Sequence, residues 1–154
     1  MKLAEALLKR AELKKTVEEL KSRAEENASV QEGEEPFEDP EEMLNKAIEV
    51  NDALTALVKR INITNQETIT ECEKSLSDLL AERDAILRKR SIVKSVIEGA
   101  RIEGRTFRFT RAEIKKVVVI DIKKMQALFD EISHDYRRLD TLIQGINWQT
   151  DLIS

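Results

Sequence analysis

The sequence predicts an all-α fold, an elongated antiparallel four-helix bundle, and three observations lead to this prediction. Of the 154 residues, 41% are hydrophobic and 36% are charged, but only 4% are aromatic. Glycine occurs four times and proline twice, well below their average usage. Apolar residues recur at helical spacing in four long windows. This composition disfavours a β-sandwich, a barrel or a glycine-rich nucleotide-binding fold, and the length suits one domain over residues 1–154.

The first two windows cover about residues 2–29 and 40–65, and each carries one apolar stripe. The second window opens with Asp39 as a capping acid, Pro40 at the first helical position and further acids in the first turn. The residues expected to face a neighbouring helix are Leu3, Leu7, Leu13, Val17, Leu20, Ala24 and Ala28 in the first window, and Leu44, Ala47, Ile48, Leu54, Val58 and Ile61 in the second.

The third and fourth windows cover about residues 75–100 and 121–149. Ser75 or Ser77 can cap the third helix, and Asp121 the fourth. The fourth stripe is the most regular, because its residues alternate steps of four and three in a heptad repeat whose seam requires another helix. Its members are Met125, Phe129, Ile132, Tyr136, Leu139, Ile143 and Ile146. Four rods of similar length bury such stripes most simply as an antiparallel bundle.

Two connections are irregular. Residues 31–42 contain seven acids and no base, which is typical of a solvated loop. Residues 101–120 include Phe107 and Phe109, separated by Arg108, and end in a β-branched run. We expect a small hairpin or an irregular packed loop here, capping one end of the bundle.

Charge is distributed unevenly along the chain. Residues 1–50 hold 8 bases and 14 acids, whereas residues 83–116 hold 11 bases and 4 acids. A basic block with interspersed aromatic side chains is one requirement of a nucleic-acid surface, so binding through residues 83–116 is one alternative function. The net charge of −4 disfavours it, and solvated helix faces explain the same charges.

The sequence indicates neither a metal centre nor a cofactor. Glu131 and His134 have the spacing of a di-iron ligand pair, but His134 is the only histidine and a second pair is needed. Cys72 lies between two glutamates, which disfavour a reactive thiolate. Phosphate-binding glycine motifs and nucleophile elbows are absent from the sequence. We therefore favour a non-catalytic protein and expect no catalytic residue, metal or cofactor.

Neither a membrane span nor a secretion signal is expected. No segment reaches the roughly 20 apolar residues that cross a bilayer. Charged residues interrupt the N-terminal segment, so it lacks the apolar centre of a signal peptide. With a single cysteine as well, the cytoplasm is the predicted location.

Arginines occupy positions where leucine is expected. At 100° per residue, Arg10 falls within the first apolar stripe, and Arg83 and Arg90 fall within the third. Up-and-down helices would place Arg10 and Arg83 at one level, approached by Tyr136 and Asp140 from the fourth helix. Charges that face a core must be paired or reach water. These five residues are the candidate ligand site, for a small anion between helices, and a purely structural arginine layer is the alternative.

Several stretches resemble the septicolysin-like family, small helical proteins of mostly bacterial origin. They are MKLAEALLKRAELKK, QEGEEPFEDPEEML, RINITN, LAERDAIL, RFTRAEIK and NWQTDL, in this order along almost the whole chain. The resemblance implies a small helical protein. It implies no activity, substrate or catalytic residue, because none is established for that family.

Together these features predict a structural or interaction protein that self-associates through helical faces, with a dimer favoured. Four narrow stripes enclose a thin core, and Ile122, Leu128 and Leu142 flank the seam of the fourth helix, which gives that helix a second apolar side. A bundle that binds a small anion, and could then be an enzyme, is the alternative. We also expect Trp148, the only tryptophan, to be buried.

Overall fold

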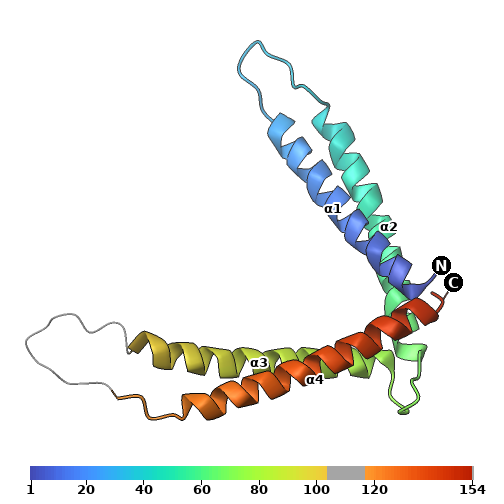
Figure 1. Cartoon of the computed structure of the whole chain (residues 1–154). Coiled ribbons are helices and arrows are strands. Elements are labelled where there is room, and N and C mark those ends of the chain that lie inside the picture. Colours follow the sequence, from blue (N-terminus) through green and yellow to red (C-terminus); the bar gives the residue numbers. More distant parts are fainter. Residues whose placement is uncertain (104–116, 154) are drawn as a thin grey trace, which may run out of the picture. The chain divides into compact units, whose positions relative to one another are not determined.

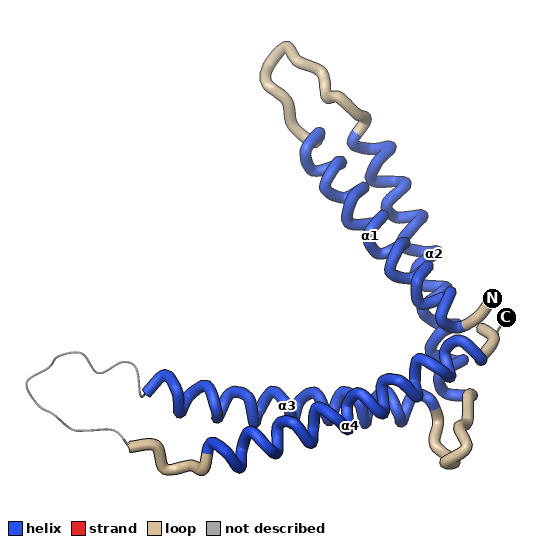
Figure 2. Tube along the Cα trace, in the orientation of Figure 1, coloured by secondary structure: helices blue, strands red, loops and turns tan. Residues whose placement is uncertain are grey.

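The computed structural model describes residues 1–103 and 117–153 and confirms the predicted all-α fold of four helices (Figure 1). The helices are α1 (Leu3–Asn27), α2 (Pro40–Glu67), α3 (Leu76–Glu103) and α4 (Ile122–Gln149). Their bounds follow the four sequence windows closely. Between the helices, the described residues form loops and turns and no strand (Figure 2).

The chain divides into two compact units. The first contains Met1–Ser77 and Gln144–Ser154, and the second contains Asp78–Ile143. The first unit holds the α1–α2 pair together with the C-terminal segment, and the second holds most of the α3–α4 pair (Figure 1). The assignment of residues 1–154 to a single domain stays a prediction. None of the described helices is long and apolar enough to cross a membrane.

The start of α2 confirms the capping prediction. The side chain of Asp39 accepts hydrogen bonds from the backbone N–H groups of Glu41 and Glu42, at 2.9 and 3.3 Å. Pro40 has no N–H group, so its place at the first helical position leaves no donor unsatisfied. The fourth helix starts similarly, because Asp121 accepts a 3.0 Å hydrogen bond from the N–H group of Lys124.

The buried stripe of α2 agrees with the predicted one at Ala47 and Ile61 and differs from it at other positions. Met43, Ala47, Leu57, Ile61 and Thr64 are buried, and Leu20 of α1 packs with the first two. Leu44 and Ile48, expected on this stripe, are exposed. The cause is that α2 carries two adjacent apolar lines and α1 covers only one of them. The line through Leu44 and Ile48 is the one left uncovered.

A network of backbone hydrogen bonds joins the two ends of the chain within the first unit. The N–H group of Leu3 donates to the carbonyl of Thr150, and that of Leu152 donates to the carbonyl of Met1, each at 2.9 Å. Lys2 adds a 2.9 Å ion pair with Asp151, which lowers the pKa of that carboxyl. We call this arrangement of residues 1–3 and 149–152 the terminal clasp.

Two side chains of α2, Arg60 and Thr64, bond the residue that follows the terminal clasp, Ile153. Thr64 is buried, donates through Oγ1 to the carbonyl of Arg60 and accepts a 3.1 Å hydrogen bond from the N–H group of Ile153. Arg60 donates through Nε to the carbonyl of Ile153 at 2.8 Å. These contacts satisfy backbone groups that burial would otherwise leave without partners.

Trp148 does not have the predicted burial: its side chain is 55% exposed. The buried positions near the end of α4 are Ile143 and Asn147. Because successive residues of a helix are 100° apart, Trp148 points away from the direction that Asn147 takes. The prediction overlooked the phase of the helix.

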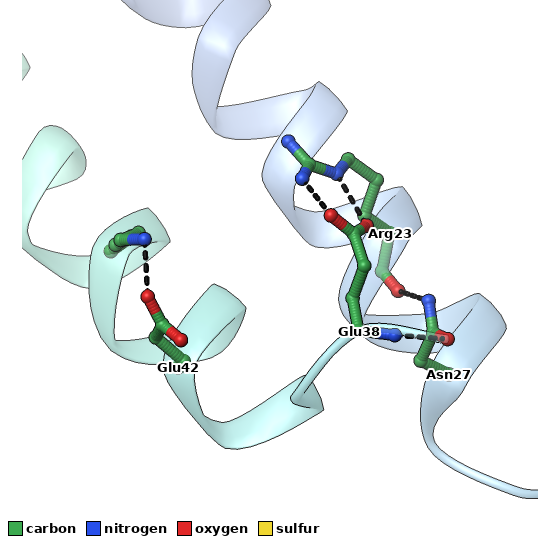
Figure 3. Close-up of polar contacts among 5 residues, drawn as sticks. Arg23, Asn27, Glu38 and Glu42 are labelled. Carbon is green, nitrogen blue, oxygen red and sulfur yellow. Dashed lines mark hydrogen bonds and ion pairs between the residues drawn. The ribbon is translucent and has the colours of Figure 1, made fainter. Parts of the chain in front are cut away.

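The loop between α1 and α2 is tied back to α1 by one glutamate (Figure 3). The guanidinium of Arg23 donates through Nε and Nη2 to the two carboxylate oxygens of Glu38, the first at 2.8 Å. The N–H group of Glu38 donates to Asn27 Oδ1 at 3.1 Å, and Asn27 itself donates to the carbonyl of Arg23. Hydrogen bonding and charge attraction from Arg23 lower the pKa of Glu38.

This ion pair predicts an acid-dependent loss of stability. Because the pKa of Glu38 is lowered by folding, the pair stabilises the fold above the ordinary carboxyl pKa, and the stabilisation disappears as pH falls through the lowered value. From pH 7 to pH 3, the melting temperature of the natural chain should therefore fall more than that of Glu38→Gln. Glu34→Gln, an exposed change in the same loop, is the control and should follow the natural chain. Parallel curves for Glu38→Gln and the natural chain would contradict the prediction.

The predicted cap over residues 101–120 lies for the most part outside the described residues. The structure describes residues 117–121 as a segment without helix or strand, ahead of the start of α4. Residues 104–116, which include Phe107, Phe109 and five of the eleven bases of segment 83–116, are outside the part of the chain that the structure describes.

Candidate functional site

The candidate site lies in the second unit, where two arginines face α4. Arg83 and Arg90 are one heptad apart on α3, in line with Leu76 and Ile97, both of which are buried. Both arginines are themselves half-buried. Their predicted place within the apolar stripe of the third helix therefore agrees with the burial pattern.

Arg83 is brought together with Asp140, as its place in the sequence predicted. Its Nη1 lies 3.4 Å from Asp140 Oδ1, and its Nη2 lies 3.5 Å from Asp84 Oδ1. Both distances are long for a charge-assisted hydrogen bond, which is typically about 2.7–2.9 Å. The positive charge of Arg83 is compensated, but neither contact has the length of a tight ion pair.

Arg90 has an aromatic partner. Its Cζ atom lies 5.0 Å from the centre of the Phe129 ring, the geometry of a cation–π contact. Phe129 also lines an open pocket of about 160 Å³, together with Lys94, Ile97, Glu98 and Gln126. We call this the Phe129 pocket.

Each of the two arginines has one hydrogen-bond donor atom without an acceptor. The Nε atoms of Arg83 and Arg90 are buried and have no hydrogen-bond partner. An unsatisfied buried donor typically costs about 1–3 kcal/mol, so either atom would gain from an acceptor. The buried hydroxyl of Ser133 on α4 is already engaged, because it donates to the carbonyl of Phe129 at 2.7 Å. Two buried donors on one helical line are the feature that favours an anion.

The other two predicted site residues are placed differently. Tyr136 lies on α4 between Ser133 and Asp140 in the heptad order and is half-buried. Arg10 lies on α1, in the first unit, and its side chain is exposed. A layer shared by Arg10 and Arg83 stays a prediction.

Sequence reasoning missed the Phe129 pocket. Phe129 was expected on the seam of the fourth helix, but not beneath an arginine. The Arg83–Asp140 pair sets two antiparallel helices in register and brings Phe129 to the level just beyond Arg90, and the spacing within one helix does not show this register. Lys94 and Gln126 could not be singled out either, since polar residues outside an apolar stripe look alike in a sequence.

Comparisons with known proteins place the chain in a family. A model of a family of unknown function, DUF6847, matches residues 10–152. No curated protein matches the chain. The chain is similar to a solved crystal structure of a functionally unknown conserved protein from Corynebacterium diphtheriae, with 38% sequence identity, a TM-score of 0.87 and 99% of each chain covered. The family match extends over nearly all of the sequence, so the chain belongs to the family of unknown function DUF6847.

Proposed function

We propose that the chain is a non-catalytic structural or interaction protein that self-associates through helical faces, with a dimer as the simplest assembly. The observation that carries this proposal is the apolar residues left exposed at helix positions. Leu128 and Leu142, two of the three residues predicted to flank the seam of α4, are 38% and 50% exposed. They are two heptads apart, so they share one side of the helix.

A second exposed apolar line supports the same proposal. Leu44 and Ile48 of α2 are one helical turn apart and expose about half of their surface, 53% and 52%. Large apolar side chains clustered on a helical face are typical of surfaces that associate with another protein. An assembly with two-fold symmetry would use the same face of both copies, so no other partner is required.

Light scattering at several protein concentrations tests the proposal. We expect a mass of twice the 17.7 kDa of the chain at tens of micromolar, falling toward one chain mass on dilution. A mass of one chain across the whole concentration range would overturn the proposal. The resemblance to the septicolysin-like family stays a prediction, and it supplies no activity for such an assembly.

The unpartnered donors of Arg83 and Arg90 favour a second candidate function, the binding of a small anion. If phosphate were this anion, a concentration of a hundred times its Kd would stabilise the fold by about 2.7 kcal/mol. The melting temperature should then rise by several degrees with phosphate, and this rise should be absent in Arg90→Met. Arg88→Met, an exposed arginine on the same helix, is the matched control and should keep the rise. An equal phosphate effect in all three proteins would argue for general ion screening and against a site.

Nucleic-acid binding through residues 83–116 stays a hypothesis. The described part of this segment exposes Arg88, Lys89 and Lys94 on α3, which any solvated helix face would also do. A salt-dependent shift of RNA or DNA on addition of the protein would favour this hypothesis.

A further inference from the structure

The acidic loop carries an aromatic side chain in water. Phe37 is 97% exposed, the most exposed of the large apolar residues described. It stands among the seven acids of residues 31–42, directly before Glu38, which Arg23 holds against α1. The loop therefore carries a phenylalanine with acids on both sides of it in the sequence. Its neighbour Glu38 is the anchored residue that Figure 3 shows.

The Phe129 pocket offers the complementary properties. Phe129 and Ile97 form its apolar part, and its volume of about 160 Å³ compares with the roughly 150 Å³ of a cavity that holds a benzene ring. The lining itself holds one base, Lys94, and one acid, Glu98. The residues that precede the lining on each helix, 88–93 and 122–125, add five bases and no acid, and Asp130 and Glu131 follow Phe129. The one acid in the lining, Glu98, is paired with Lys94 at 3.6 Å.

We propose that Phe37 of one copy binds in the Phe129 pocket of a second copy, with the acids of its loop facing the bases of α3 and α4. This inference rests on the proposed self-association and names the segment and the surface that meet. This chain itself contains the acidic loop, the bases of α3 and α4 and the exposed phenylalanine, so a second copy can supply everything that the contact needs. In a symmetric dimer, each copy would give one loop and receive one, so the contact is made twice.

The contact has two parts that can be tested separately, the burial of the Phe37 ring and the attraction between opposite charges. Removing either part should weaken the binding of one copy to the other. Phe37→Ala removes the buried ring and, because the side chain is exposed in the single chain, leaves the fold intact. Lys94→Glu reverses one charge at the pocket, and Lys94 is also exposed. Phe37→Ala should raise the dimer dissociation constant by about tenfold or more, as for other buried interface anchors. Lys94→Glu should also raise it, because it places a like charge opposite the acids of the loop.

Sedimentation velocity of the full chain measures this constant for both variants and for two matched controls. Val30→Ala changes an exposed apolar residue near the loop, and Lys9→Glu reverses an exposed charge on α1. Both controls should dissociate as the natural chain does. We also expect added salt to weaken the natural dimer more than the Lys94→Glu dimer.

The outcomes separate this inference from the proposed function. A natural chain that dimerises, with Phe37→Ala and Lys94→Glu weakened and the controls unchanged, would support both. A natural dimer that neither variant weakens would overturn the inference and leave self-association standing. A natural chain that stays monomeric would overturn both.

Discussion

Leu3→Ala is expected to lower the free energy of unfolding by about 2–5 kcal/mol, the range for a fully buried leucine. Leu3 is 0% exposed, and it lies in the terminal clasp, where its N–H group also bonds the carbonyl of Thr150. The substitution keeps that backbone bond but opens a cavity between the start of α1 and the C-terminal segment. The loss should therefore come from packing alone.

Urea unfolding followed by circular dichroism measures this loss. The matched control is Leu8→Ala on the same helix, because Leu8 is 65% exposed. The control should change stability by no more than about 0.5 kcal/mol. If the two leucines cost the same, the terminal clasp would not be a packed part of the fold.

The double substitution Leu128→Lys and Leu142→Lys is expected to dissociate the proposed dimer. Both residues are partly exposed in the single chain, so the helix pair should still fold. A lysine forced into an apolar interface must lose water without gaining a partner, which costs several kcal/mol. Since each 1.4 kcal/mol is a factor of ten, the dissociation constant should rise by about a hundredfold or more.

The control for this pair is Ala127→Lys with Thr141→Lys, which adds the same charge at exposed positions one residue earlier. Sedimentation velocity should show the control as a dimer and the first pair as a monomer. Circular dichroism should be unchanged in both. Equal dissociation constants for the two pairs would show that this side of α4 is not the interface.

The helices could be predicted because their signals are local. Asp39 and Pro40 mark the start of α2 through the chemistry of a single turn, and the structure has that helix where these residues place it. Helical spacing alone also placed Arg83 and Arg90 within the stripe of α3, and the expected approach of Asp140 to Arg83 required the up-and-down arrangement of the helices as well.

What the sequence could not supply is which of two apolar sides a neighbour covers. Leu44 and Ile48 have the same spacing as a buried stripe, yet they are exposed because α1 covers the line through Met43 and Ala47. The predicted burial of Trp148 was wrong for a related reason. A large apolar side chain does not show which side of its helix faces a neighbour. The Phe129 pocket depends on two helices in register, which no single window contains.

The central claim is that this chain functions as an assembly of its own copies, and native mass spectrometry of the purified protein tests it most directly. It reports the number of chains and any retained small molecule in one measurement. We predict a main species of twice the 17.7 kDa chain mass at low micromolar concentration, with no added mass. A species of one chain at every concentration would contradict the claim, and one chain with an added small mass would favour the anion site instead.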